Sequence, residues 1–291
     1  MSSEFAKVDS LGKFIDAVSE LRGFWGLPKH KELWFRGEAQ DYGDTILRPE
    51  LYRPVKGKPL KPISKLLSIE NHLSDEFRRN AVEYVPTSDD WDWDSYFLMQ
   101  HHECPTRLLD WSDGALMAMH FALRDKKHDD KDARVYVLAV DRLNEQLKQL
   151  PDVQIAKAAW KDLAAKRPSY ELDEDLWEGS YLPSDDDDRA ELNVPRPPLI
   201  LDFPHITRRI AAQRSRFIVF GTEPNWLSDE FTKTDTTIKL IRIPKEHRPT
   251  IRQELRDCGL TESVIYPDLD GLGREMKQLW EDRRAAPEEN A

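Results

Sequence analysis

The sequence predicts a single α+β domain in which a small mixed or antiparallel sheet is flanked by helices. Residues 135–140 are apolar on both alternating faces, which is typical of a central strand covered on both sides. Amphipathic segments with helical spacing lie before and after this strand. The 291 residues allow one large domain or two small ones, and an apolar content of 39% with nine Trp is ample for a core.

The first elements are a helix and a short strand. Residues 1–30 are predicted to form an N-terminal helical element, whose helix begins at Ser10 because the apolar residues that follow recur at helical spacing. Residues 33–36 predict a strand that Gly37 ends. Arg36 would therefore lie at a strand end.

The next elements are two helices, a strand and a third helix. Residues 66–84 and 91–101 predict helices, and residues 105–110 predict a strand. Ser112 or Asp113 can cap the helix that follows. Small residues on one face of that helix would allow a close approach to a sheet: Ala115, Ala118 and Ala122.

An insertion is predicted over residues 141–204, where a helical stretch is followed by an acidic run at 185–188 and a Pro-rich segment. We interpret the acidic run as a solvated loop. A divalent-metal site is the alternative, but its ligands would need geometry rather than density, so no metal is assigned. The remaining elements are strands at 216–221 and 236–243, closing helices over 255–280 and a flexible tail at 281–291.

Charge and cysteine content restrict the classes of protein. A net charge of −11 argues against a general nucleic-acid binder, although a local basic patch stays open. The two cysteines, Cys104 and Cys258, do not form a disulfide framework, and the N-terminus lacks a secretory signal. No apolar segment approaches the roughly 20 residues that span a bilayer. We expect a cytoplasmic protein without membrane association.

Reactive side chains are concentrated between residues 100 and 112. This segment holds an amide, two imidazoles, a thiol, a guanidinium, a carboxylate and an indole. It could be a functional site. It could also be a structural corner in which Arg107 pairs with Asp110 and Trp111 fills the core, because buried charges persist mainly when they are paired. A thiol nucleophile at Cys104, activated by His101, is a further alternative.

Four ordered motifs resemble the FRG domain family. They are the Phe-Arg-Gly motif at 35–37, the Pro-Thr-Arg-Leu-Leu-Asp-Trp block at 105–111, the Arg-Ile-x-x-Gln-x-x-x-Phe block at 209–217 and the Tyr-Pro-Asp-Leu-Asp-Gly-Leu segment at 266–272. The resemblance implies an FRG domain over residues 31–280. Two departures stand out. Glu103 replaces a usual Gly, so this turn either does not need a positive φ or tolerates strain, and Ser112 replaces a usual Thr.

The order of these motifs is similar to that of ADP-ribosyltransferases. This remote resemblance implies a split sheet of the ADP-ribosyltransferase type and NAD as a substrate. Arg36 would hold the phosphate or ribose of NAD, Gly37 would let the backbone approach the nicotinamide amide, and His101 would orient a ribose hydroxyl. The implied cofactor-binding residues are Arg36, Gly37, Gln100, Thr106, Arg107, Trp111, Ser112 and Phe217.

Transfer of ADP-ribose needs an anion or a hydrogen-bond acceptor near an oxocarbenium-like centre, to stabilise its positive charge. The candidates are Asp110 and Gln213, which complete a catalytic set with Arg36 and His101. Gln213 stands where most active transferases have Glu, and an amide cannot be a general base at neutral pH. Either Asp110 or Glu38 compensates, or catalysis is altered or absent.

The resemblance implies a bacterial toxin or phage-defence effector that modifies a macromolecular acceptor, protein or nucleic acid, and that an antitoxin or inhibitor could control. Two alternatives stay open. The first is a noncatalytic module that binds a nucleotide or phosphate through its arginines, namely Arg36, Arg107, Arg209 and Arg214. The second is an RNA-acting nuclease that uses His101, Asp110 and Arg107 for acid–base chemistry.

Overall fold

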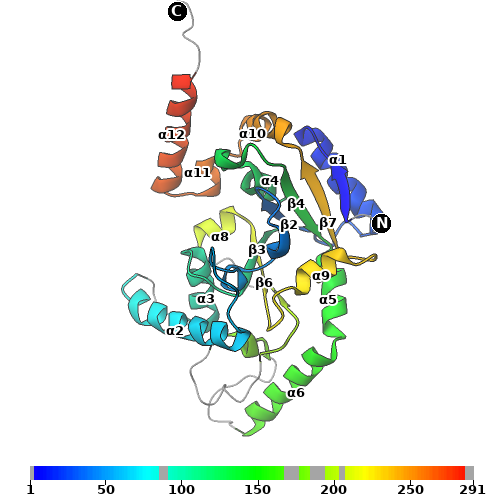
Figure 1. Cartoon of the computed structure of the whole chain (residues 1–291), viewed down its shortest axis with the longest axis vertical. Helices are drawn as coiled ribbons and strands as arrows, with labels where there is room; N and C mark the ends of the chain where they lie inside the picture. Colours follow the sequence, from blue (N-terminus) through cyan, green and yellow to red (C-terminus); the bar gives the residue numbers. More distant parts are fainter. Residues whose placement is uncertain (1–2, 85–90, 167–176, 184–193, 203–206, 286–291) are drawn as a thin grey trace, which may run out of the picture.

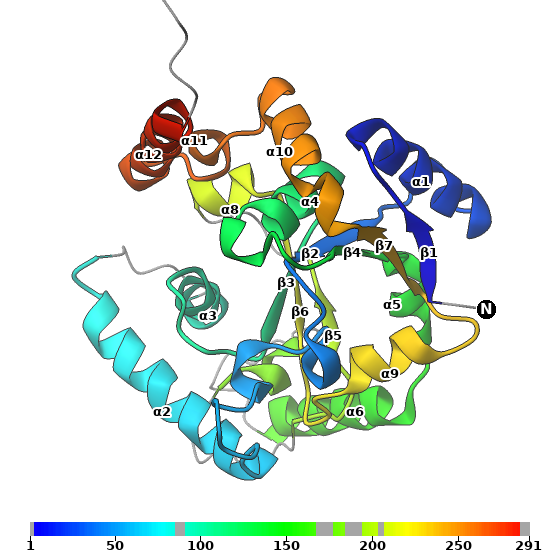
Figure 2. The same cartoon turned by 45° about the horizontal axis from the view of Figure 1, so that its top comes forward.

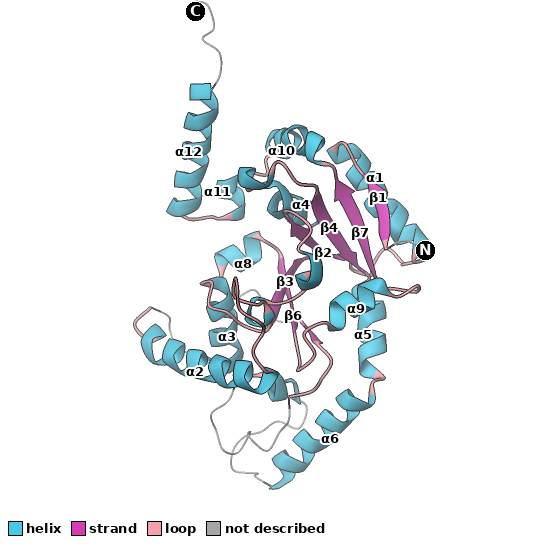
Figure 3. Ribbon diagram, viewed as in Figure 1, coloured by secondary structure: helices cyan, strands magenta, loops and turns pink. Residues whose placement is uncertain are grey.

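A computed structural model of the chain describes residues 3–84, 91–166, 177–183, 194–202 and 207–285. It confirms the α+β class: a seven-stranded mixed sheet runs through the molecule with helices packed around it (Figure 1, Figure 3). The strands are β1 (Glu4–Lys7), β2 (Trp34–Glu38), β3 (Leu108–Ser112), β4 (Ala133–Leu138), β5 (Leu199–Leu201), β6 (Ser215–Val219) and β7 (Ile238–Ile243).

The described helices are α1 (Leu11–Phe24), α2 (Ile63–Ala81), α3 (Trp91–His101), α4 (Ala115–Leu123), α5 (Val140–Lys148), α6 (Pro151–Lys166), α8 (Arg208–Ala212), α9 (Trp226–Thr232), α10 (Arg248–Asp257), α11 (Glu262–Ile265) and α12 (Leu269–Ala285). Short 3-10 helices are η1 (Gly43–Thr45), η2 (Glu50–Tyr52), η3 (Lys126–His128), η5 (Trp177–Tyr181) and η6 (Lys245–His247).

The strand order is β1-β7-β4-β2-β3-β6-β5, with β1 parallel to β7 and the other neighbours antiparallel. The sheet is larger than the sequence pattern indicated, because the short edge strands β1 and β5 were not predicted. The pairing between its two halves is short. β2 pairs with β4 over its whole length, whereas β2 and β3 share the single register pair Phe35–Ser112. The two halves of the sheet therefore diverge on one side of this pair.

Helices cover both faces of the sheet. α1, α4 and α10 pack on one face of the β1-β7-β4-β2 half, and α5 and α9 pack on the other (Figure 2). α3 and α6 pack against the β3-β6-β5 half. The α12 helix stands at the edge of the molecule, beside α11 (Figure 1). Among the described residues, no helix has both the length and the apolarity needed to cross a membrane.

Gly37 does not end its strand, contrary to the sequence expectation, because β2 continues to Glu38. The glycine is required by packing instead: a Cβ atom there would lie 1.8 Å from the main-chain oxygen of Ala118 and 2.7 Å from the nitrogen of Ala122. The predicted close approach of the small face of α4 to the sheet is confirmed.

The strand predicted at 105–110 begins later, at Leu108. Side chains take the preceding amides: the Arg107 amide donates to Glu70, and the Leu108 amide donates to Thr106 Oγ1 at 3.0 Å. Pro105 has no amide to donate. These amides do not pair with β6, and the strand begins at Leu108.

Other boundaries agree in part. The helix over 91–101 is confirmed by α3, and Ser10 caps α1 by accepting from the amide of Lys13. The tail predicted from residue 281 is helical as far as Ala285. The acidic run at 185–188 lies outside the described residues.

Candidate functional site

A cavity of about 530 Å³ opens where β2 and β3 diverge. Its walls come from β2, β3 and β6, from the C-terminal ends of α3 and α4, from α8, and from the loops that follow β2 and α11. We call it the cleft. The predicted site residues that line it are Arg36, Gly37, Gln100, His101, Asp110, Trp111, Ser112, Gln213 and Phe217.

Arg36 and Glu38 form an ion pair along one face of β2. Arg36 Nε donates to Glu38 Oε1 at 3.1 Å, and Arg36 Nη1 donates to the main-chain oxygen of Asp110 at 2.7 Å. The second contact bridges the gap where β2 and β3 no longer pair. Glu38 is only 3% exposed, and its Oε2 atom has no hydrogen-bond partner in the described structure. A buried carboxylate oxygen without a donor is costly, so Glu38 keeps unused acceptor capacity within the described structure.

Asp110 is the second cleft carboxylate. Gln100 Nε2 donates to its Oδ2 at 2.5 Å, and the Gln100 amide oxygen accepts from Thr106 Oγ1 at 2.6 Å. Asp110 is exposed to solvent at the cleft. Desolvation by the neighbouring protein atoms raises the pKa of its carboxyl group, although Arg36 and Gln100 oppose the shift. Asp110 is thus a better proton acceptor than an ordinary aspartate.

His101 is a neutral base at physiological pH. Burial, followed by the nearby positive charges of Arg209 and His102, lowers its pKa from 6.5 to about 4. Its ring has no proton to donate from a charged form near pH 7, and its role in orienting a ribose hydroxyl stays a prediction.

Gln213 and Ser112 meet at the edge of β3. Ser112 Oγ donates to the main-chain oxygen of Gln213 at 2.9 Å and accepts from the amide of Gly114 at 3.0 Å. Gly114, rather than Ser112 or Asp113, occupies the N-cap position of α4, and no side chain caps it. The side chain of Gln213 makes one long contact, 3.5 Å from Nε2 to the Ile265 oxygen.

Two aromatic residues of the cleft, Trp111 and Phe217, are also core residues. Trp111 is 3% exposed and packs with apolar side chains beneath the sheet, as the structural alternative predicted, yet it borders the cleft. Its indole Nε1 has no hydrogen-bond partner in the described structure. Phe217 packs against Phe97 with ring centroids 4.9 Å apart.

Arg107 does not line the cleft, which corrects its predicted role in ligand binding. It is 1% exposed, and its Nε atom lies 2.5 Å from Glu70 Oε2. Its remaining donors reach the main-chain oxygens of Phe220 and Tyr181. The predicted pair of Arg107 with Asp110 is also wrong, because Glu70 on α2 takes that place. Thr106 is fully buried and reaches the cleft only through Gln100.

Two further expectations are resolved at the turn after α3. Glu103 has a φ of 63°, so the turn does need the left-handed conformation and this residue tolerates its strain. Cys104 does not line the cleft, and burial, together with Glu70 and Glu50, raises the pKa of its thiol. A raised pKa opposes the thiolate that a cysteine nucleophile needs.

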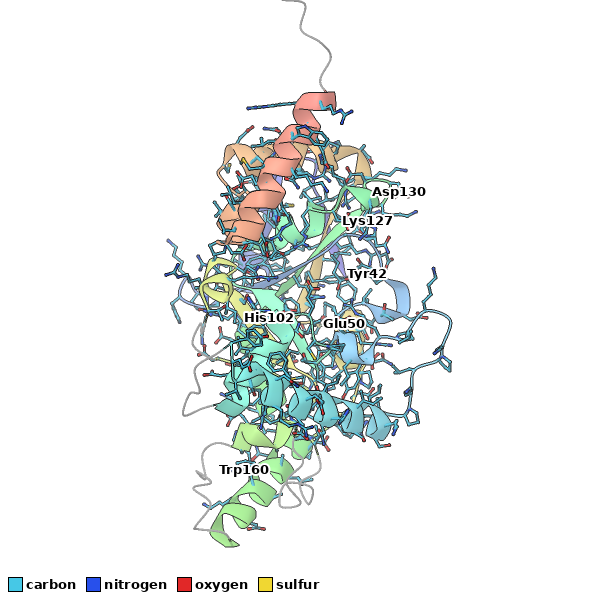
Figure 4. All side chains as sticks on the ribbon, turned by 90° about the vertical axis from the view of Figure 1, so that its left-hand side faces the viewer. Tyr42, Glu50, His102, Lys127, Asp130 and Trp160 are labelled. Carbon is cyan, nitrogen blue, oxygen red and sulfur yellow. The ribbon has the colours of Figure 1, made fainter. Side chains whose placement is uncertain are left out.

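Several cleft residues were not predicted as site residues. Glu38 was named only as a substitute for Gln213. Arg209 was named only in the binding-module alternative. Tyr266 belongs to a quoted motif, which could have indicated it, whereas Tyr42, Arg53, Arg124 and Lys127 lie in segments without a motif. In Figure 4, Tyr42 and Lys127 lie on the same side of the molecule, far from Trp160 on α6.

The cleft differs in charge from the chain as a whole. Its walls hold five Lys or Arg and four Asp or Glu, a surplus of one positive charge on a chain with a net charge of −11. A site that concentrates guanidinium groups in this way favours an anionic ligand.

Comparison with known proteins supports the family resemblance over part of the chain. Residues 31–131 match the FRG domain family, and this segment contains β2, α3, β3 and α4, which form much of the cleft. No curated protein matches the chain, and no solved structure matches it.

Proposed function

We propose that this protein is an ADP-ribosyltransferase-like enzyme that takes NAD into the cleft and transfers ADP-ribose to a macromolecular acceptor. The observation that carries the proposal is the Glu38 carboxylate. One of its oxygens is held by Arg36, and the other is buried and without a donor at the cleft wall. A preorganised negative charge of this kind is what a developing cation at a sugar carbon requires.

The residues of the cleft fit a dinucleotide. A volume of about 530 Å³ lies within the range of small-molecule sites. The walls combine guanidinium groups, which bind phosphate, with aromatic side chains, which pack on planar rings: Phe35, Tyr42, Phe121 and Phe217. When NAD is bound, it supplies an activated bond between the ribose carbon and the nicotinamide nitrogen.

The two cleft carboxylates have environments suited to different tasks. Arg36 keeps Glu38 paired with a positive charge, so this carboxylate can stabilise positive charge at the ribose carbon as the bond to nicotinamide breaks and its electron pair leaves with nicotinamide. Asp110 has a raised pKa and can take the proton from the acceptor nucleophile as the new bond to that carbon forms. Gln213 can orient a hydroxyl in this scheme but accepts no proton.

A labelling experiment tests the proposal. Purified protein is incubated with cell lysate and NAD that is labelled on its adenylate, and label is followed on protein and on nucleic acid separately. We expect covalent label with wild type and with the surface control Glu20→Gln, and its loss with Glu38→Gln. Measurable binding of ADP-ribose without any transfer would instead establish the noncatalytic binding module.

The nuclease alternative is weaker on geometric grounds. It requires His101, Asp110 and Arg107 around one phosphodiester, but Arg107 is buried against Glu70 and does not reach the cleft. A role as a toxin or phage-defence effector, and control by an antitoxin, stay predictions from the family resemblance.

A further inference from the structure

One side of the cleft gathers positive charge around a single tyrosine. Tyr266 is 5% exposed, and the guanidinium carbons of Arg209 and Arg274 each lie 4.5 Å from its ring centroid. Arg124 lies 5.3 Å from the same centroid and donates to the Tyr266 hydroxyl. We call these four residues the Tyr266 cluster. Cation–π contacts hold the guanidinium groups in place, but they do not neutralise their charges.

The three arginines differ in how their charge is balanced. Arg274 Nε lies 3.2 Å from Glu262 Oε2, so its charge is paired. Arg124 and Arg209 have no carboxylate within ion-pair distance in the described part of the chain, and Arg209 Nε has no hydrogen-bond partner there. Arg124 and Arg209 also line the cleft, whereas Arg274 does not. The unpaired charges are therefore the ones that a ligand in the cleft can reach.

The pKa of His101, a neighbouring side chain, is affected by the same positive charge. His101 borders the cleft beside Arg209, and its pKa is lowered first by burial and then by the charge of Arg209. An anion bound between Arg124 and Arg209 would relieve this field. Each guanidinium presents a planar set of donors that matches the oxygens of a phosphate.

We propose that Arg124 and Arg209, held by Tyr266, form a subsite for a phosphate group of the substrate. The phosphate could belong to the diphosphate of the ADP-ribose donor or to the acceptor. The subsite itself follows from the unpaired guanidinium groups, and only the choice between these two substrates rests on the proposed function.

Calorimetric titration with inorganic pyrophosphate and with ADP-ribose tests the subsite. We expect affinity to fall about tenfold in Arg209→Gln and in Arg124→Gln, since each loses charge-assisted hydrogen bonds, and to recover largely in Arg209→Lys. Arg274→Gln is the matched control, because it contacts the same ring but its charge is already paired. Circular dichroism verifies that each variant is folded. Equal affinities in all of the Gln variants and wild type would overturn the subsite.

Measuring KM for NAD and for the acceptor shows which substrate carries the bound phosphate, and it separates the subsite from the proposed function. A higher KM for NAD in Arg209→Gln assigns the phosphate to the donor, and a higher KM for the acceptor alone assigns it to the acceptor; either supports the subsite. If pyrophosphate binding depends on Arg124 and Arg209 while wild type transfers no label, the subsite stands and the proposed function fails. If transfer occurs and neither KM nor pyrophosphate affinity changes in the variants, the subsite fails alone.

Discussion

Two Arg–Glu pairs in this chain differ in whether all of their polar atoms have hydrogen-bond partners. In the pair of Glu70 with Arg107, every polar atom has a partner: Glu70 also accepts from the Tyr96 hydroxyl at 2.5 Å and from the Arg107 amide at 2.9 Å. In the pair of Glu38 with Arg36, one carboxylate oxygen is buried without a donor, and both residues line the cleft. The Glu70–Arg107 pair connects α2 to the residue before β3, and the Arg36–Glu38 pair lines the cleft.

The comparison shows that burial and charge alone do not identify a functional residue. Burial by itself would lower the pKa of Arg107, but the facing Glu70 carboxylate outweighs burial and raises the pKa. The positive charge of Arg107 is therefore balanced within the protein. The Glu38 pair leaves acceptor capacity unused at the cleft wall. Incomplete hydrogen bonding is what separates the candidate site from structural support.

The largest effect is expected from breaking the complete pair. Glu70→Gln leaves the Arg107 charge buried without a counter-charge and should lower the free energy of unfolding by about 3–5 kcal/mol. Glu38→Gln should cost less, about 1 kcal/mol, because the Arg36 side chain is 16% exposed, against 1% for Arg107, and keeps its bond to the main-chain oxygen of Asp110. Urea unfolding of both variants measures the difference. Similar losses in the two variants would contradict the division into structural and functional pairs.

The next largest effect concerns catalysis. Glu38→Gln should lower kcat for nicotinamide release about a hundredfold, as expected for the loss of a preorganised charge at a reacting centre, while the affinity for ADP-ribose stays nearly unchanged. Any loss in Glu70→Gln should follow only the fraction of unfolded protein. Release of nicotinamide, followed by chromatography at fixed folded concentration, distinguishes these outcomes. A Glu38→Gln variant with wild-type kcat would remove Glu38 from the mechanism.

Gly37 lies between the residues of the Arg36–Glu38 pair and offers an intermediate test. Gly37→Ala forces a methyl group into the backbone of α4 and should destabilise the protein by about 1–3 kcal/mol. Gly23→Ala is the control, because nothing lies within 4 Å of a Cβ atom at that helical position. It should be neutral or stabilise by up to about 1 kcal/mol. Thermal unfolding compares the two, and equal melting temperatures would show that α4 shifts freely.

The smallest effect is a pH dependence. Because the folded pKa of His101 is about 4 and its ordinary value is 6.5, the unfolded chain binds more protons between these values. The contribution of His101 to stability is thus complete above pH 6.5 and declines as pH falls towards 4. Between pH 7 and pH 5, wild type should lose more stability than His101→Asn. The control is His30→Asn, because His30 is exposed and does not line the cleft, and this variant should behave as wild type.

The sequence by itself determined the class of the fold and the location of most of the cleft. Strand β4 and helix α1 follow from local apolar patterns, and such patterns depend only on residues a few positions apart. The dense polar stretch at residues 100–112 and the Phe-Arg-Gly motif indicated the two strands that border the cleft. The edge strands β1 and β5 were not predicted, because they are too short to show an alternating pattern.

Only the tertiary structure decided what each polar residue does. Arg107 pairs with Glu70, 37 residues away, and not with the nearby Asp110. Glu38 has a buried carboxylate oxygen without a donor, and it lines the cleft that opens where β2 and β3 separate after one register pair. Arg124 and Arg209 meet at Tyr266 from distant segments. Ion pairing, burial and unsatisfied hydrogen bonds depend on which segments meet in space, and local periodicity carries no information about that.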